Sequence, residues 1–199
     1  MKEECPDFTK AEAFIISLLK ENLSPELLYH NIGHTLDVLD AALKISESEK
    51  ISKDEIKLLR IAVLFHDAGF VHVYKNHEVT GCEMVREYLP RFGFTKIQIA
   101  TICEMIMSTQ IPQRPKTLLD RIIADADLDY LGRDDVHHIA GKLYEEMKLY
   151  KQLTDEKKWI PFQIDFLRQH QYFTCYSKNN RETGKNLYMD ELIEKTRAK

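Results

Sequence analysis

The chain has 199 residues, of which 44% are hydrophobic and 30% are charged, and its formal net charge at pH 7 is −4. This length can bury a sizeable core without disulfides. The acidic balance, without any basic stripe, excludes an obvious binder of nucleic-acid polymers, because affinity for the phosphate backbone rests on clustered Lys and Arg.

The cysteines and the hydropathy favour a reduced, cytoplasmic protein without a membrane partner. None of the four cysteines forms a CxxC pair, so the sequence indicates neither a disulfide framework nor a thiolate zinc site. The N-terminal MKEECPDFTK lacks the apolar stretch of a signal peptide. No run approaches the ~18 consecutive apolar residues of a transmembrane helix.

Apolar residues recur with helical spacing almost throughout, and no strand-like alternation, internal repeat or interdomain linker is found. Glycine and proline are also few for this length. Apolar stripes predict helices over the following stretches: 11–19, 36–43, 56–63, 79–85, 99–106, 118–123 and 136–147. The tail, 155–197, adds two helices broken around 178–180. We therefore expect an all-α bundle of about eight or nine helices.

Two helix starts have recognisable sequence signals. Ser24-Pro25-Glu26 combines a capping serine, proline at the first helical position and an acid near the positive end of the helix dipole. Ser52 with Glu55 three residues later is typical of a capping box. The helix that this box opens is expected to run directly into a His-Asp pair at 66–67.

Three short stretches concentrate histidines and carboxylates: YHNIGH (29–34), FHDAG (65–69) and ADADLD (124–129). His66-Asp67 ends a long apolar stripe, where a carboxylate is costly to bury unless it is paired or bound to metal. Adjacent helical side chains diverge by about 100°, so other helices must complete any shell around one ion. His34 and an aspartate of the third stretch could do so.

Two histidines and two aspartates would leave open positions on a six-coordinate ion. Such a site suits Mn, Fe, Ni, Co or Mg better than a closed structural zinc site. A bound metal would also supply the positive charge that a small phosphorylated substrate needs.

The ordered pattern His…His-Asp…Asp resembles the HD superfamily of metal-dependent phosphohydrolases over about residues 29–132, and YHNxxH resembles a motif of cyclic-nucleotide phosphodiesterases. The resemblance implies the metal ligands His34, His66, Asp67 and Asp127. The family's A-x-D-L or A-D-L context, present here as A-D-L at 126–128, selects Asp127 over Asp125, which is instead expected to cap backbone or to pair with Arg121.

The same resemblance implies catalytic roles for His30 and Asp67. His30 would donate the proton to the leaving oxygen, while Asp67 would bridge a second ion or orient the attacking water. His77 and Glu78 resemble the region where small HD proteins add ligands to a second metal or support the first. The number of ions, one or two, stays open.

Substrate contacts are predicted from charge and aromatic content. Arg133, directly after the third stretch, and Lys75 are the preferred phosphate contacts. HQYFT (170–174) would either wall a base pocket or pack the tail on the core, and packing is favoured. The phosphodiesterases also have a glutamine-based clamp for the purine base, and we do not locate its counterpart in this sequence.

We expect one domain over 1–199, with a motif core at about 29–132 and a helical extension at about 133–197. The expected function is metal-dependent hydrolysis of a phosphate ester, favouring a nucleotide or cyclic-nucleotide phosphodiester. A 5′-nucleotide phosphomonoesterase is the nearest enzymatic rival. A non-catalytic ligand-sensing module and a di-iron oxygenase are alternatives of other classes. A homodimer is left open.

Overall fold

Residues 6–153 and 155–197, which the computed structural model describes, form ten α-helices and four short 3-10 helices without a strand among them, confirming the all-α prediction. No described helix has the length and apolar content needed to cross a bilayer. The α-helices are α1 (Phe8–Asn22), α2 (Ile32–Glu49), α3 (Lys53–Phe65), α4 (His77–Tyr88), α5 (Lys96–Ser108), α6 (Leu118–Asp127), α7 (Val136–Leu149), α8 (Trp159–Gln169), α9 (Cys175–Asn180) and α10 (Glu182–Arg197). The 3-10 helices are η1 (Ala68–Val71), η2 (Leu89–Phe92), η3 (Asp129–Gly132) and η4 (Glu156–Lys158).

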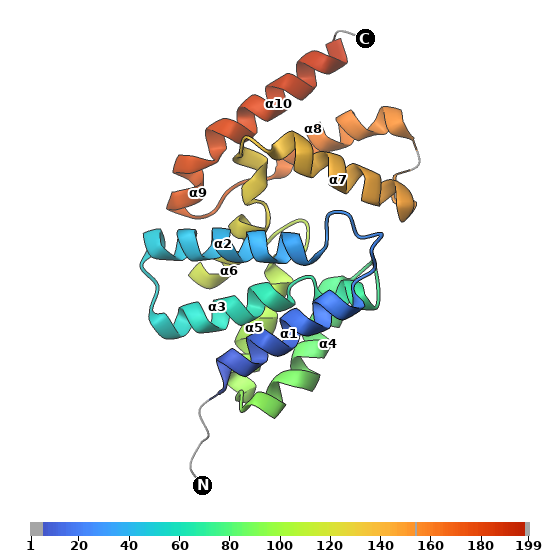
Figure 1. Ribbon diagram of the computed structural model, residues 1–199. Helices are drawn as coiled ribbons and strands as arrows, with labels where there is room; N and C mark the ends of the chain where they lie inside the picture. Colours follow the sequence, from blue (N-terminus) through green and yellow to red (C-terminus); the bar gives the residue numbers. More distant parts are fainter. Residues whose placement is uncertain (1–5, 154, 198–199) are drawn as a thin grey trace.

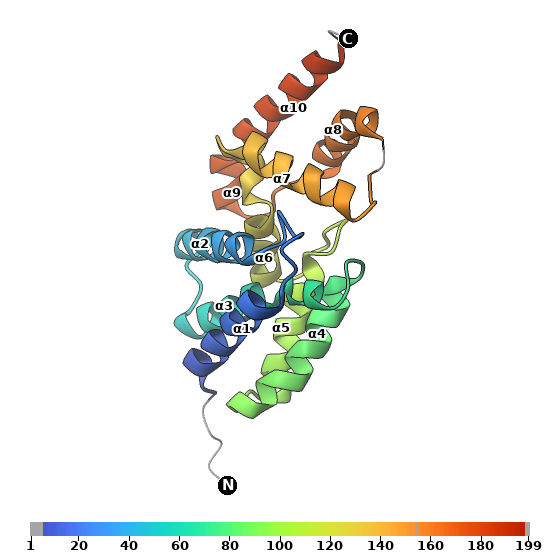
Figure 2. The same cartoon turned by 45° about the vertical axis from the view of Figure 1, so that its right-hand side comes forward.

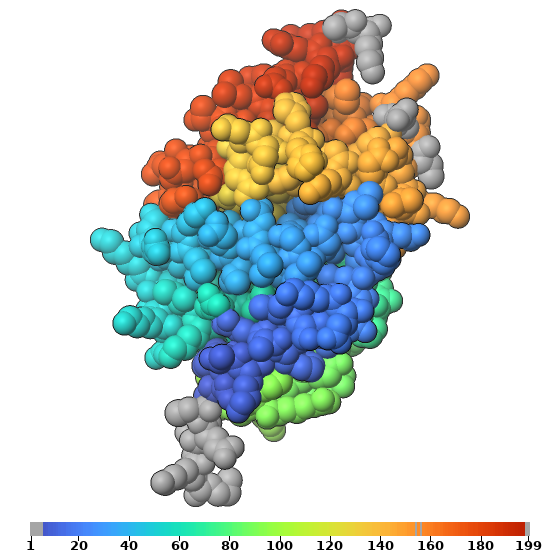
Figure 3. Space-filling model, in the orientation of Figure 1, coloured from blue at the N-terminus to red at the C-terminus, as the bar shows by residue number. Residues whose placement is uncertain are grey.

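The helices gather around two hydrophobic clusters. Helices α1 to α6 bury the larger cluster, and η3, α7, α8 and α10 bury the smaller one. Figures 1 and 2 both place α7 to α10 at one end of the molecule and α1, α4 and α5 at the other. Figure 3 shows the C-terminal helices adjoining α2. Tyr29 packs in the smaller cluster although it precedes α2, so the YHNIGH stretch lies where the clusters meet.

One predicted helix start is wrong and the other is confirmed. The segment after Ser24 forms turns rather than a helix, and α2 begins only at Ile32. Asn31 is its cap, since the Asn31 side chain accepts hydrogen bonds from the backbone of Gly33 and His34. The segment stays non-helical because Tyr29 and His30 donate their N–H groups to a distant glutamate. The capping box of Ser52 and Glu55 is present at the start of α3.

The tail contains one more break than expected. The chain interrupts its helices at 170–174 as well as at Arg181. The HQYFT segment packs on the core: Tyr172 is 1% exposed and its hydroxyl donates to the carbonyl of Leu128. Asp125 accepts hydrogen bonds from the backbone of Phe173 and from both the backbone and the hydroxyl of Thr174, at 2.6–2.8 Å. Asp125 therefore caps the backbone N–H groups of this segment, which is one of the two roles predicted for it from the sequence.

Removing this anchor should destabilise the fold. Asp125→Ala leaves three buried or partly buried donors without their charged acceptor, and we expect the free energy of unfolding to fall by about 3 kcal/mol. Urea denaturation followed by circular dichroism measures the change. Asp190→Ala, at an exposed position on α10, is the matched control and should stay within about 0.5 kcal/mol of the parent. Equal stability of the two variants would contradict the anchoring role.

Candidate metal centre

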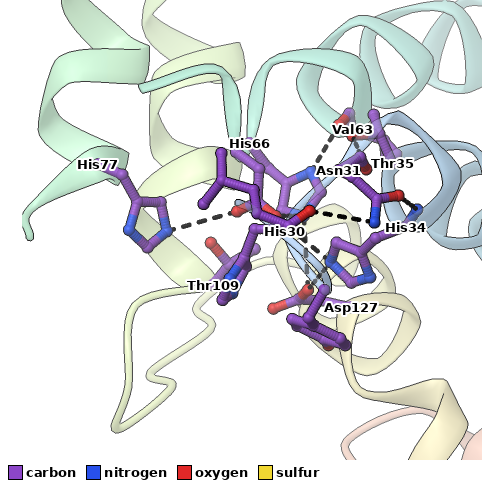
Figure 4. A network of polar contacts seen from close by, with 12 residues as sticks. His30, Asn31, His34, Thr35, Val63, His66, His77, Thr109 and Asp127 are labelled. Atoms are coloured by element: carbon purple, nitrogen blue, oxygen red, sulfur yellow. Dashed lines mark hydrogen bonds and ion pairs between the residues drawn. The ribbon is translucent and has the colours of Figure 1, made fainter. Parts of the chain in front are cut away.

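Three helix ends bring the predicted ligands together (Figure 4). His34 lies in the first turn of α2, His66 caps the C-terminus of α3 with Asp67 directly after it, and Asp127 ends α6. The Nε2 atom of His34 lies 3.2 Å from Oδ1 of Asp127 and 3.4 Å from Oδ2 of Asp67. The Nε2 atom of His66 lies 3.4 Å and 3.3 Å from the same two oxygens. All four predicted ligands therefore share one small volume.

The donor set fits a divalent cation. Three atoms of the four ligand side chains are buried without a hydrogen-bond partner among the described residues: Nε2 of His34, Nε2 of His66 and Oδ2 of Asp67. Nδ1 of His66 lies 2.7 Å from the carbonyl oxygen of Val63, which can only accept, so Nδ1 carries a proton and Nε2 is the atom that would give its lone pair to a bound cation. Ligand atoms of His34, His66 and Asp127 also lie within 4.8 Å of one another. Lone pairs that converge in a buried place are stabilised by a shared cation.

The electrostatics show how tightly these groups interact. Burial would lower the pKa of His34, but Asp127 and Asp67 outweigh it and raise that pKa to about 9. Burial would raise the pKa of Asp127, but His34 and His66 outweigh it and lower that pKa to about 2. The pKa of His66 is likewise raised and that of Asp67 lowered. In the metal-free protein, protons on the imidazoles therefore balance the carboxylates.

The second oxygen of Asp67 faces a different partner. Its Oδ1 lies 3.4 Å from Nε2 of His77, at the start of α4, and that nitrogen lies 3.6 Å from Oε1 of Glu78. Gly69 permits this approach, because a Cβ at Gly69 would overlap the backbone of His77. His77 and Glu78 thus lie beside the ligand cluster, where they could hold a second ion.

His30 is positioned by a residue that the sequence analysis missed. Glu146, on α7, is fully buried, and its Oε1 lies 2.5 Å from Nδ1 of His30. The other oxygen accepts the backbone N–H groups of Tyr29 and His30, and Tyr74 donates its hydroxyl to Oε1. Burial raises the pKa of Glu146, but the His30 contact and these bonds outweigh it and lower that pKa. The sequence did contain a signal for Glu146, because this acid lies about one helical turn after Leu143 within the apolar stripe of 136–147.

Phe70 holds the ring of His30 from another side. The two rings stack with centroids 4.2 Å apart, and Phe70 also stacks on His77 at 4.0 Å. With Nδ1 facing Glu146, the other ring nitrogen, Nε2, is left to act in the site.

A cavity of about 550 Å³ reaches the ligand cluster. His30, Asp67, His77 and Asp127 contribute to its wall. Aromatic side chains supply much of the remainder: Tyr29, Tyr74, Tyr130, Trp159, Phe162, Phe166 and Tyr188. No lysine or arginine of the described residues lines it. Gln163 also lines the cavity, and its amide donates to the hydroxyl of Tyr188.

The structure does not bring the two predicted phosphate contacts to this cavity. The guanidinium of Arg133 donates to Asp37 and to Asp135, each at 2.9 Å, and so ties η3 to α2. Lys75 is exposed in the loop before α4. Neither side chain lines the cavity. Arg133 is held away from the cavity because its guanidinium pairs with Asp37 and Asp135. A third carboxylate, that of Asp129, lies 3.6 Å from it.

Comparison with known proteins identifies the family. The family model of the HD domain matches residues 31–129, a range that contains all four ligands. The chain therefore belongs to the HD-domain family. Helices α7 to α10 lie outside the matched range.

Two solved structures share the fold. One is described as a predicted HD superfamily hydrolase from an uncultured Thermotogales bacterium; it is 23% identical, with a TM-score of 0.55, covering 84% of this chain and 93% of its own. The other is a protein from Lactobacillus plantarum, which is 13% identical with a TM-score of 0.64. The match covers 96% of this chain and 97% of that protein. Among proteins with curated descriptions, none matches the chain. The family and the ligand cluster together support a metal-dependent hydrolase.

The paired charges make stability depend on pH and metal. His34 has its pKa raised from 6.5 to about 9 in the folded protein, so its stabilising contribution is complete below pH 6.5 and is lost as the pH rises towards 9. In EDTA, we expect the melting temperature to fall between pH 6.5 and pH 8.5. Mn²⁺ should oppose the fall, because metal binds the deprotonated imidazole.

Thermal unfolding at several pH values, with EDTA or Mn²⁺, measures this dependence. His34→Gln is the control, since it removes the titrating group, and its melting temperature should change less over the same range. If the melting temperature of the parent protein in EDTA depends on pH in the same way as that of His34→Gln, then His34 is not protonated against Asp67 and Asp127 as described.

Proposed function

We propose that the protein hydrolyses a phosphate ester, foremost a nucleotide or cyclic-nucleotide phosphodiester, with a water activated by a divalent metal. The observation that carries the proposal is the convergence of buried, partnerless ligand atoms from His34, His66 and Asp67 beside a histidine fixed by a carboxylate. Both features border one cavity large enough for a small ligand.

His34, His66, Asp67 and Asp127 would hold the ion, and His77 and Glu78 are placed to hold a second one. When bound, Mn, Fe, Ni, Co or Mg would lower the pKa of a water towards neutrality and supply positive charge to the phosphoryl group. Asp67 offers one oxygen to each side, Oδ2 towards the imidazoles and Oδ1 towards His77. It is therefore the residue suited to bridge two ions or to orient water.

His30 supplies the proton for the leaving oxygen. Glu146 accepts from Nδ1 and fixes the ring, while Phe70 stacks on one face. The proton on Nε2 is then the one available for transfer. Acid catalysis of this kind contributes roughly 10²–10⁴-fold to the rate.

The cavity wall supports the substrate class. Its aromatic side chains suit a flat base, and the absence of lysine and arginine among its described lining leaves the metal as the main source of positive charge. A phosphodiester carries one negative charge, so it needs less compensation than a polyphosphate. A 5′-nucleotide monoester is the second enzymatic candidate, favoured by the two polar ligands, His77 and Glu78, that could hold a second ion.

Turnover of defined esters tests the proposal. We expect metal-dependent hydrolysis of bis-p-nitrophenyl phosphate, and kcat/KM for a 3′,5′-cyclic mononucleotide at least tenfold above that for a nucleoside triphosphate. Metal content is measured in the same samples. Faster hydrolysis of 5′-monophosphates would establish the monoesterase instead. No turnover with any of the five metals, despite stoichiometric metal, would favour a ligand-sensing module.

A pair of variants separates the metal ligands from the proton donor. His66→Ala should lose both metal and turnover while the helical circular dichroism persists. His30→Ala should keep its metal and lose roughly 10²–10⁴-fold in kcat. An unchanged rate in His30→Ala would remove His30 from the mechanism, and retained metal in His66→Ala would defeat the ligand assignment.

A further inference from the structure

A second concave surface, of about 720 Å³, follows one side of α5. We name it the α5 groove. Its walls come from α4, η2, α5, the 109–117 loop and the start of α6. It shares no lining residue with the cavity at the metal centre. The α5 groove is therefore a separate place for a ligand.

Four exposed cations line the groove: Arg86, Lys96, Arg114 and Lys116. None of their side chains forms an ion pair or hydrogen bond within residues 6–153 and 155–197, whereas Arg133 pairs with Asp37 and Asp135. Cations gathered around one concavity repel each other, and an anion between them relieves that repulsion.

Among the described residues that line the groove, two are acids, and one of them already accepts backbone hydrogen bonds. Asp120 is buried, and its Oδ2 accepts the backbone N–H groups of Lys116 and Thr117. Glu104 is the other acid, and it is exposed. Four cations against two acids leave the lining at +2, although the whole chain is at −4. The wall of the catalytic cavity has the opposite sign, with carboxylates and no lysine or arginine in its described lining.

We propose that the α5 groove binds a small phosphorylated molecule carrying two or more negative charges. Guanidinium groups bind phosphate through paired hydrogen bonds, and lysines add point charges. Ile99, Ala100 and Met107 provide an apolar surface for the rest of the ligand. The volume falls within the range of small-molecule sites. A concave surface of this size favours a small ligand over an extended acidic peptide.

The 109–117 loop couples this site to the metal centre. Thr109 and Ile111 line the catalytic cavity, whereas Arg114 and Lys116 line the α5 groove. Between them, the side chain of Gln113 donates to the carbonyl of Ala124 on α6, the helix that ends at Asp127. A ligand that draws Arg114 and Lys116 together therefore acts on the segment that forms part of the catalytic wall.

Calorimetry on the full chain in EDTA tests the binding, with inorganic pyrophosphate and ADP as probes. Without metal, the catalytic cavity offers neither probe a lysine or arginine in its described lining. We expect one site per chain, weakened at least tenfold by the double variant Arg114→Ala, Lys116→Ala. The control Lys53→Ala, Lys195→Ala removes the same charge from positions outside the groove and should bind within threefold of the parent.

Equal weakening in both double variants, or no binding of either probe, would overturn the site. Binding of hexaglutamate without binding of pyrophosphate or ADP would instead mark a docking surface for an acidic protein segment, and would also overturn it. Tighter binding of ADP than of pyrophosphate would support a contribution from the apolar surface.

Trp159 reports on the coupling, since it is the single tryptophan of the chain and lines the catalytic cavity. Pyrophosphate in EDTA should change its fluorescence with the dissociation constant found by calorimetry, and the Arg114→Ala, Lys116→Ala variant should lose the change. Binding without any change in Trp159 emission would overturn the coupling. Neither measurement depends on turnover, so the result stands apart from the proposed hydrolase activity.

Discussion

The structure depends on one electrostatic constraint, the burial of two carboxylates against two imidazoles at the meeting point of three helix ends. Asp67 and Asp127 are too costly to bury as isolated ions, so a balancing positive charge is required beside them. Protons on His34 and His66 supply it in the metal-free protein, which is why their pKa values are raised. A divalent cation supplies it more effectively, because it also satisfies lone pairs that have no hydrogen-bond donor. The packing of α2, α3 and α6 serves to hold these ends together.

The catalytic arrangement extends beyond the HD domain itself. The family match stops at residue 129, yet the carboxylate that positions His30 comes from α7, and much of the aromatic cavity wall comes from α8. Tyr29 also links the two parts of the molecule, because it precedes α2 but packs in the smaller hydrophobic cluster with the C-terminal helices. The C-terminal helices are therefore part of the site, although they lie outside the residues that the family model matches.

Local sequence patterns pointed to His66-Asp67 and to the ADADLD stretch because polar groups there interrupt apolar helices and need partners, and the resemblance to the HD superfamily added His34 and selected Asp127. The Ser52 capping box was predictable for the same reason, as its partners lie three residues apart. Glu146, Arg133 and the loop after Ser24 depend instead on contacts across 72 to 117 residues of sequence. No pattern within a single helix shows that the N–H groups of Tyr29 and His30 will meet a glutamate of α7, so the helix start there was misplaced.

The distribution of charge has a consequence for how substrate binding and catalysis are linked. Arg133 is held in ion pairs and no lysine or arginine lines the described catalytic wall, so a phosphate substrate of the proposed kind finds no fixed cation beside the charge-balanced ligand cluster until metal is bound. The metal must then contribute to substrate affinity as well as to the reaction. In an enzyme whose lysines and arginines bind phosphate, metal loss would chiefly lower kcat. Here the same loss should remove affinity too, which makes metal occupancy the step that admits the substrate.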